Sequence, residues 1–564
     1  MQKQSRKKTR ISYCVLCRAA AAVFAVLLLP ACSGFLDGNA FASHVQRYTV
    51  KIAAQKIVPE YAITPNSKGV FMVPSAIKTN TVAFQVILNN YGGVKLDVKM
   101  KKDYPGVVVA IEDNYSVLTA TLPPISKSTA YDMEIELTAA ELLRPIKPIV
   151  LPKIIRKAAS DFYVDSVAGS DEDNYLGTME KPFKTLAYAL EYAESESNST
   201  LYLEDGSGDT QRYAGGIVID GDKYPLITIS TYDNDGDKGV AKIVPSPGNP
   251  AKSIIEVKNG GRLTIGSSAK TNIMLTGATG AAALSIHSEA SKSGIVDLYG
   301  SIEGNNLSGT STSAVHVGNK GEFLCYGIIK NNEAKKGGAV YLAGGTVTIG
   351  SGSSSAAIND NFASSDGGAF YVNGGTVVAK NCTIAGNAAN TGDGGAVYIA
   401  TGKFEIREAA GGVVTIGESS NPNEAISGNG GSVYIGPTPS AVFLATGGTV
   451  KDSSAAVHGD DVYVSAGRTL HVSGTVKIGD VYLNNAGGNR GIISVVGLMD
   501  NTATGMKIGI DTSNQTNFSD SAFFVEVQDD SYATGAWTNN FLRPGGQSFS
   551  YTFLGGKKVL FRDK

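Results

Sequence analysis

The chain has 564 residues, of which 67 are glycine, 19 are proline and one is tryptophan, and 42% are hydrophobic. A chain of this length is too long to fold around one ordinary hydrophobic core. The composition excludes wholesale disorder and favours a turn-rich all-β protein over a helical one. All six charged residues of the first 31 are basic, which leaves 43 of the 49 basic side chains against 51 acidic ones in the rest of the chain. This acidic balance argues against a nucleic-acid partner.

The first 31 residues have the pattern of a signal peptide, with a basic start and an apolar core at 19–31 that is too short to span a bilayer comfortably. The stretch Leu29-Pro30-Ala31-Cys32 resembles the bacterial lipobox, although Pro30 departs from the usual small or hydroxyl residue. The resemblance implies cleavage before Cys32 and lipidation of Cys32. The alternative is an ordinary signal peptide followed by an incidental cysteine.

The lipid would hold the mature protein at a membrane, because each buried methylene contributes about 0.8 kcal/mol. We therefore expect a signal peptide at 1–31, a tether at 32–46 and a place in the cell envelope. Attachment to the outer membrane with exposure at the surface is the favoured location, and the periplasmic face is the alternative.

Residues 47–140 alternate between apolar and polar side chains as half-buried strands do, for example over Val82–Leu88, Val94–Met100, Val107–Ile111 and Tyr131–Leu137. About seven such runs predict a small, immunoglobulin-like β-sandwich. Residues 141–158 have a proline every three or four positions between Pro145 and Pro152, which predicts an extended linker.

The next segment resembles the opening module of bacterial pectate-lyase-like β-helices, with Phe162-Tyr163-Val164-Asp165 followed by a glycine turn and by Lys181-Pro182-Phe183-Lys184-Thr185. The resemblance implies a first strand and then a short helix, over Thr185 to about Ala193, that covers the open end of the β-helix.

Repeats are the most informative pattern in the sequence, because self-similarity at a fixed spacing predicts a stacked architecture. The motif Gly-Gly-Ala-Val-Tyr at 337–341 recurs, with weaker last copies, so that its tyrosines are spaced by 30, 27, 36, 29 and 19 residues. These tyrosines are Tyr341, Tyr371, Tyr398, Tyr434, Tyr463 and Tyr482, and His316 and His287 extend the series upstream. One repeat of about 28 residues is expected to form one coil.

Two further elements belong to each repeat. Gly345–Gly350 (Gly-Thr-Val-Thr-Ile-Gly) has echoes at 261–266 and 474–479, which predicts a second strand. An isoleucine followed three residues later by an asparagine, which tolerates left-handed backbone and can stack its amide on equivalent amides, marks the third element. Its copies are Ile302/Asn305, Ile329/Asn332, Ile358/Asn361, Ile384/Asn387 and Ile426/Asn429.

Three short strands per coil cannot bury an apolar face alone, so stacking must close the core. We expect an all-β chain in which a right-handed parallel β-helix occupies 159–510, follows the β-sandwich and is capped by a β-hairpin segment at 511–564. The repeats over about 280–490 resemble those of chlamydial-type polymorphic membrane proteins, with isoleucine in place of phenylalanine in the second motif. That resemblance implies a surface-exposed adhesin, but residues 510–564 are too few for the translocator barrel of that family.

The enzyme alternative is a lyase or hydrolase of acidic polysaccharides, which needs clustered carboxylates. His458-Gly459-Asp460-Asp461 superficially resembles the paired aspartates of polygalacturonases, but both aspartates occupy the repeat positions of Gly431 and Ser432, and a degenerate corner is favoured. Asp233-Asn234-Asp235-Gly236-Asp237 lacks the glycine position of an EF-hand, which favours an exposed acidic turn over a calcium site. We predict no catalytic residues, no metal site and no cofactor.

The tyrosine series Tyr341, Tyr371, Tyr398, Tyr434 and Tyr463 is the candidate ligand-binding site. If the alternate Val340, Phe370 and Val397 point inward, the phenols form an outward stripe suited to sugars or to a protein partner. The alternative is an aromatic ladder that only stabilises the sheet.

After signal cleavage, Cys325 and Cys382 are the remaining cysteines besides Cys32. Their spacing of 57 residues corresponds to two coils, roughly 9–10 Å, which exceeds disulfide reach, so we expect two small buried residues. The favoured function is a lipid-anchored envelope protein with a non-catalytic β-helix used for adhesion, for ligand binding to a host or cell-surface protein or glycan, or as a structural component.

Overall fold

The computed structural model describes residues 52–57, 65, 69–73, 78–90, 94–112, 115–126, 129–139, 146–157, 161–172, 175–193, 198–206, 211–224, 226–233, 239–289, 292–486, 489–500, 502, 505–511, 523–532, 537–542, 549–554 and 557–562. The chain divides into two compact units between residues 159 and 160. The expected signal peptide, Cys32 and the tether lie outside the described residues. Within the described residues, no helix has both the length and the apolar character needed to cross a membrane.

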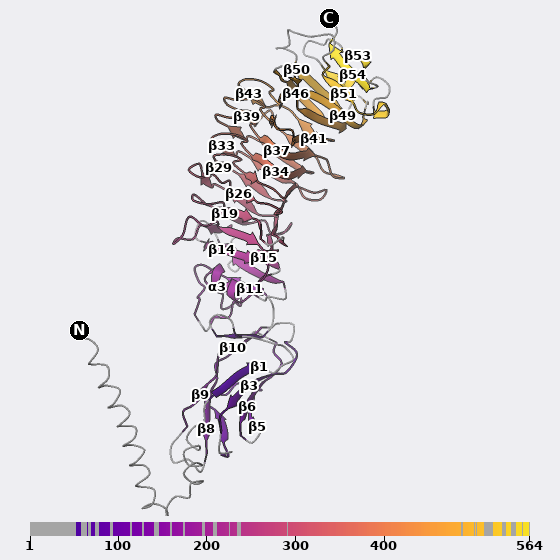
Figure 1. Ribbon diagram of the computed structural model, residues 1–564. Helices are drawn as coiled ribbons and strands as arrows, with labels where there is room; N and C mark the ends of the chain where they lie inside the picture. Colours follow the sequence, from indigo (N-terminus) through magenta and orange to yellow (C-terminus); the bar gives the residue numbers. More distant parts are fainter. Residues whose placement is uncertain are drawn as a thin grey trace, which may run out of the picture. The chain divides into compact units, whose positions relative to one another are not determined.

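The first unit is a small β-sandwich built around one apolar core that includes Phe84, Leu118 and Ile135, each 0% exposed. One antiparallel sheet has the order β1-β3-β6-β5, and two three-stranded sheets have the orders β4-β8-β9 and β2-β10-β7 (Figure 1). The strands are β1 (Ile52–Ile57), β2 (Phe71–Val73), β3 (Val82–Leu88), β4 (Asp97–Met100), β5 (Val108–Glu112), β6 (Val117–Leu122), β7 (Thr129–Tyr131), β8 (Glu134–Thr138), β9 (Ile149–Val150) and β10 (Ile154–Arg156).

The structure differs from the sequence prediction at the expected linker, because β9 and β10 belong to the sheets of this unit. β9 pairs with β8, and β10 lies between β2 and β7. β9 lies between Pro148 and Pro152, and β10 follows Pro152, so neither short strand contains a proline. The fully buried Arg156 fixes β10 by donating to the backbone carbonyls of Pro123 and Asn80. The predicted strand Tyr131–Leu137 is interrupted at Asp132, whose backbone carbonyl and N–H both bond to the Tyr104 hydroxyl.

The second unit is a right-handed parallel β-helix with three faces, and a typical coil contributes one strand to each face (Figure 1). The first face consists of β14 (Ile217–Asp220), β17 (Ile255–Lys258), β20 (Leu284–Ile286), β26 (Val315–Val317), β30 (Val340–Leu342), the starts of β34 (Phe370–Ala379) and β37 (Val397–Ile406), β40 (Val433–Ile435), β44 (Val462–Val464) and the end of β46 (Lys477–Leu483).

The second and third faces continue each coil. The second consists of β11 (Asp161–Val164), β12 (Ser199–Glu204), β15 (Leu226–Tyr232), β18 (Arg262–Ile265), β23 (Ile295–Leu298), β27 (Glu322–Cys325), β31 (Thr346–Ile349), the ends of β34 and β37, β41 (Ala441–Ala445), β45 (Thr469–Gly474), β49 (Ile492–Met499) and β51 (Val525–Val527). The third consists of β13 (Arg212–Ala214), β16 (Ala241–Val244), β19 (Ile273–Thr276), β24 (Ser301–Glu303), β28 (Ile328–Lys330), β32 (Ala356–Asn359), β35 (Cys382–Ala385), β38 (Val414–Ile416), β42 (Thr449–Val450), the start of β46, β50 (Lys507–Asp511) and β52 (Phe541–Leu542).

The middle coils add a fourth element that the sequence did not predict, a ladder of two-residue strands after the third face. It comprises β25 (Asn306–Leu307), β29 (Glu333–Ala334), β33 (Phe362–Ala363), β36 (Ala388–Ala389), β39 (Glu424–Ala425) and β43 (Ser454–Ala455). Two small hairpins project from the coils, β21 (Ser288–Glu289) with β22 (Lys292–Ser293) and β47 (Asn485–Ala486) with β48 (Asn489–Arg490).

Inward side chains of the three faces, such as Val347, Ile358 and Val397, are 0% exposed and form the interior of the solenoid. The Gly-Gly corners allow the coils to stack closely. Gly367 has φ of 67°, and a Cβ on Gly368 would lie 2.1 Å from the carbonyl oxygen of Gly395 in the next coil. The repeated glycine pair is therefore required by backbone conformation at its first position and by space at its second.

Both ends of the β-helix are closed. The helix α3 (Leu186–Glu191) begins after Thr185, whose hydroxyl accepts from the Tyr188 N–H, and it buries Leu186 against the first coil, as expected for the capping helix. At the other end, β53 (Phe549–Leu554) and β54 (Lys557–Arg562) form the predicted hairpin, and β54 pairs antiparallel with β51. The single-turn helices η3 (Asp530–Tyr532) and η4 (Trp537–Asn540) lie nearby in the sequence.

The parallel stacking continues beyond residue 510, where the sequence placed the end of the β-helix. β51 pairs in parallel with β49, and β52 pairs in parallel with β50, so the coils extend to Leu542. These last coils lack the Gly-Gly motif, which is why the repeat pattern alone did not detect them.

Candidate functional site

The tyrosines of the repeat motif form one continuous column on the outside of the first face. Their strands pair in register, so that Tyr341 lies opposite Tyr371, Tyr371 opposite Tyr398, and Tyr398 opposite Tyr434. Tyr463 and Tyr482 continue the column. Ring centroids of neighbours are 5.0–5.3 Å apart with interplanar angles between 2° and 20°.

The inward and outward assignment of this face is as predicted, since Val340, Phe370 and Val397 are at most 1% exposed. Each ring, however, places its face against the next ring, and Tyr371 and Tyr463 are only 9% and 8% exposed. Burial raises the pKa of Tyr398 and Tyr434, so their phenols stay protonated. A ligand on this surface would therefore contact ring edges and hydroxyls, and the stacking itself has the geometry of the stabilising ladder.

The upstream end of the column differs from the prediction in one residue. His316 stacks on Tyr341 with centroids 5.4 Å apart, as expected. His287 is outside the column, because Ser285 pairs with His316, and His287 lies 3.3 Å from the Glu256 carboxylate instead. The coil before His316 carries the hairpin β21–β22, and this local irregularity shifts the count by two residues.

The asparagines of the third motif form a buried ladder just after the third face. Nδ2 of Asn305 donates to Oδ1 of Asn332 at 2.8 Å, and the same bond links Asn332 to Asn361 at 2.9 Å and Asn361 to Asn387 at 3.0 Å. The next member is Asn423, at 3.0 Å from Asn387. The predicted Asn429 is wrong for this position.

The error at Asn429 has a local cause, because the coil after Asn387 is longer. Ile416 takes the place equivalent to Ile384, and a turn with the Glu418–Asn421 bridge then separates it from Asn423. Asn429 bonds to Asp393 instead. Similarly, the echo at 474–479 belongs to the third face, since Ile478 pairs with Val450, and not to the second face that contains 345–350.

Asp460 and Asp461 lie in the corner that stacks on Gly431 and Ser432, as the repeat alignment suggested. Asp461 is 4% exposed, and its two carboxylate oxygens accept from the backbone N–H groups of Ser453 and Asp480 at 3.2 and 2.8 Å. Asp460 accepts from the Ala455 N–H at 3.0 Å. Burial, together with the nearby carboxyl groups of Asp480 and Asp460, raises the pKa of Asp461 to about 7 against the lowering effect of those two hydrogen bonds. These carboxylates hold the corner together.

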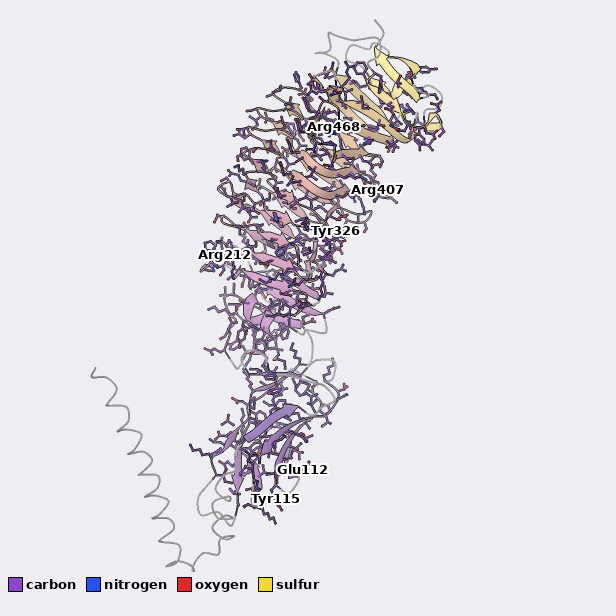
Figure 2. The ribbon with its side chains drawn as sticks, viewed as in Figure 1. Glu112, Tyr115, Arg212, Tyr326, Arg407 and Arg468 are labelled. Atoms are coloured by element: carbon purple, nitrogen blue, oxygen red, sulfur yellow. The ribbon has the colours of Figure 1, made fainter. Side chains whose placement is uncertain are left out.

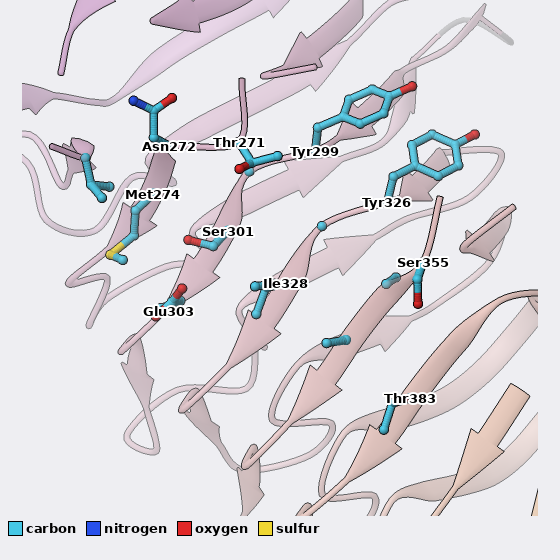
Figure 3. A pocket seen from close by; sticks show the side chains of 15 residues that line it. Thr271, Asn272, Met274, Tyr299, Ser301, Glu303, Tyr326, Ile328, Ser355 and Thr383 are labelled. Carbon is cyan, nitrogen blue, oxygen red and sulfur yellow. The ribbon is translucent and has the colours of Figure 1, made fainter. Parts of the chain in front are cut away.

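A groove of about 620 Å³ on the outside of the third face is the second candidate surface (Figure 3). It crosses the strands β19, β24, β28, β32 and β35, so a ligand in it would contact successive coils. Tyr299 and Tyr326 stand side by side at one edge with centroids 4.9 Å apart, and Figure 2 shows Tyr326 on the outside of the unit. The rest of the lining is mixed, with the apolar Met274, Ile328 and Ala357 beside polar residues, namely Thr271, Asn272, Ser301, Glu303, Ser355 and Thr383.

The sequence analysis did not identify this groove, although a signal for it exists. Tyr-Gly occurs at 299–300 and again 27 residues later at 326–327, one coil apart. A Cβ on Gly327 would lie 2.0 Å from the Gly300 carbonyl oxygen, so glycine is required there for the turns to stack. Glu303, which lines the groove, forms an ion pair at 3.4 Å with Lys330, its neighbour on the adjacent strand.

The cysteines are free and buried, as predicted. The geometric reason given by the spacing was wrong, however, because Cys325 ends β27 on the second face and Cys382 begins β35 on the third face. Burial raises the pKa of Cys325 to about 12.

Of the acidic turn at 233–237, only Asp233 is among the described residues, directly after β15.

Comparison of the chain with models of protein families, with curated proteins and with solved structures finds no match.

Proposed function

We propose that this protein is a cell-envelope protein, held at a membrane by lipid on Cys32, whose β-helix binds a glycan without cleaving it. The observation that carries the proposal is the groove of the third face. It combines two tyrosine rings with hydroxyl, amide and carboxylate groups, and these are the groups that bind the apolar faces of sugar rings and the sugar hydroxyls.

The direction of the groove supports an extended ligand. Ser301, Ile328 and Ala357 occupy equivalent positions on three consecutive strands, so the groove repeats with the coil spacing of about 4.8 Å along the solenoid. A chain molecule lying across the strands would contact one such position in each coil. Ile328, which is 40% exposed, adds an apolar floor.

The carboxylates support binding over hydrolysis. Glycoside hydrolysis uses a pair of carboxyl groups, and the described residues that line the groove supply one, Glu303, which is paired with Lys330. Asp460 and Asp461 bond to backbone N–H groups in a different corner. The tyrosine column is a second surface for a partner, available through its ring edges.

A glycan array probed with the purified protein tests binding, and incubation with polygalacturonate tests turnover. We expect retention of at least one class of glycan, no release of unsaturated or reducing ends, and loss of at least tenfold in affinity on Tyr326→Ala. The matched control is Tyr551→Ala, a 54% exposed tyrosine near the other end of the unit. Turnover that disappears in Asp461→Ala would instead establish the polysaccharide-active enzyme.

Anchoring is tested separately by metabolic labelling with a radioactive fatty acid in a bacterial host. Label should enter the wild-type chain and be absent from Cys32→Ser. Protease treatment of intact cells then distinguishes the two membrane faces, because release of β-helix fragments requires exposure at the cell surface.

A further inference from the structure

Three acidic side chains converge at a corner in the first coils of the β-helix, where the second face turns toward the third. Glu204 is the last residue of β12, Asp205 follows it, and Asp233 follows β15. Each contributes one carboxylate oxygen to a group in which all three oxygens lie within 4.8 Å of one another.

Strand pairing explains why these residues meet. β12 and β15 pair in parallel with Glu204 opposite Tyr232, so Asp205 and Asp233 leave matching strand ends in successive coils. The Asp205 N–H donates to the Tyr232 carbonyl at 3.1 Å, which continues the ladder one residue past β12 and fixes the backbone of Asp205.

Burial makes this cluster different from an ordinary acidic surface. Glu204 and Asp205 are 3% and 2% exposed. Oδ2 of Asp205 accepts from the Asn272 amide, whereas its Oδ1 is buried within the described residues without a hydrogen-bond donor. A buried carboxylate oxygen without a donor lowers the free energy of unfolding, because folding removes its hydrogen bonds to water and no protein donor replaces them.

A divalent cation at the centre of the three carboxyl groups would supply the missing partner of Oδ1. It would also offset the repulsion between carboxylates whose oxygens lie within 4.8 Å of one another.

The surroundings are rich in oxygen. Asn272 comes from the following coil, and its Oδ1 accepts from the Thr231 hydroxyl at 2.6 Å. Its Nδ2 also donates to the Gly239 carbonyl at 3.2 Å. A Cβ on Gly239 would lie within 2.1 Å of the carbonyl oxygens of Asp205 and Gly206, so backbone oxygens crowd the same corner.

We propose that Glu204, Asp205 and Asp233 bind one Ca²⁺ ion that fastens the first two coils of the β-helix to each other. Ca²⁺ accepts 6–8 oxygen ligands of mixed type in irregular geometry, which suits carboxylates from two coils beside carbonyl oxygens. Mg²⁺ demands near-octahedral geometry and keeps several waters, which suits this buried corner less.

The test uses the purified full-length protein after treatment with a chelator. Calorimetric titration with CaCl₂ should show one binding event per chain, and Ca²⁺ should raise the thermal unfolding midpoint because it binds the folded state. Asp205→Asn should weaken binding at least tenfold and raise the midpoint of the calcium-free protein. The control Asp222→Asn, an exposed residue paired with Lys292 at 2.6 Å, should bind like the wild type.

Absence of both binding heat and a midpoint shift up to about 10 mM CaCl₂, well above the range of extracellular calcium modules, would overturn the proposal. Equal affinity for Mg²⁺, or unchanged Ca²⁺ affinity in Asp205→Asn, would also overturn it. If Asp205→Asn does not fold, judged by circular dichroism, Asp233→Asn at the less buried position replaces it, with the same tenfold loss expected.

Discussion

The side-chain amide of Asn332 donates from Nδ2 to Oδ1 of Asn361 at 2.9 Å, although 29 residues separate them, and each side chain is 1% exposed. Asn332 Nδ2 also donates to the Ile302 carbonyl at 2.9 Å, and its backbone N–H donates to the same Oδ1 of Asn361. Each asparagine thus satisfies a backbone and a side-chain group of its neighbours. The ladder links the middle coils to one another along one edge through direct amide hydrogen bonds.

Removal of one ladder member is expected to destabilise the β-helix strongly. Asn361→Ala leaves the Asn332 amide and backbone N–H without their acceptor in a buried corner, at a cost of roughly 2–4 kcal/mol in the free energy of unfolding. Urea denaturation followed by circular dichroism measures the change. Asn306→Ala, an exposed neighbour of the ladder, should change it by less than about 0.5 kcal/mol.

Gly368→Ala is expected to destabilise the protein by about 3 kcal/mol or more, because the new methyl would lie 2.1 Å from the Gly395 oxygen and 2.5 Å from the Ala388 nitrogen. Gly309→Ala is the control, since a Cβ there meets nothing within 4 Å. Thermal unfolding of both variants checks this. Equal midpoints would show that the coils can separate at the corner without strain.

Stability should fall as the pH rises from about 4 to about 7, because of the corner around Asp480. Burial, together with the charges of Asp511 and Asp460, raises the pKa of Asp480 to about 7, and the hydrogen bond from the Asp460 N–H opposes this shift. Between about pH 4 and about pH 7 the folded state therefore keeps a proton that the unfolded chain has already released. The free energy of unfolding falls as the pH rises through this range.

Asp480→Asn tests this pH dependence, since asparagine can still accept from the Asp460 N–H. Relative to the wild type, the variant should be of similar stability at pH 4 and more stable by about 1–2 kcal/mol at pH 8, as measured by urea denaturation. Asp452→Asn on an exposed turn should follow the wild type. A constant difference between Asp480→Asn and the wild type at both pH values would contradict the assignment.

The tyrosine column should contribute to stability through its ring faces. Tyr398→Ser removes two stacked contacts, with Tyr371 and Tyr434, at an expected cost of roughly 1–3 kcal/mol, whereas Tyr398→Phe keeps the stack and should cost less than about 1 kcal/mol. Chemical denaturation compares the two. If Tyr398→Ser unfolds like the wild type but loses glycan retention, the column is a binding surface and not a stabilising ladder.

The repeat motif predicted the β-helix because local sequence and stacking agree in the middle coils. Gly367 adopts a left-handed backbone conformation, and the backbone of the next coil lies too close to Gly368 for a side chain. Tyr371 alternates with inward-pointing residues. One short motif therefore specifies both a corner and a strand. Where coils differ in length, the spacing of residues in the sequence predicted the wrong member of the column or ladder, as at His287 and Asn429. Spacing counts residues, whereas strand pairing allows turns of different length between paired strands.

The sequence by itself determined the all-β class, the coil, the inward and outward sides of the first face and the helix that covers its start, because these follow from alternation, glycine conformation and repetition. The tertiary structure decided which side chains from separate coils meet. Glu204 and Asp233 converge, and Tyr299 and Tyr326 border a groove, only because parallel strands place residues about 27–29 positions apart next to each other. The sequence of a single coil does not predict either of these contacts.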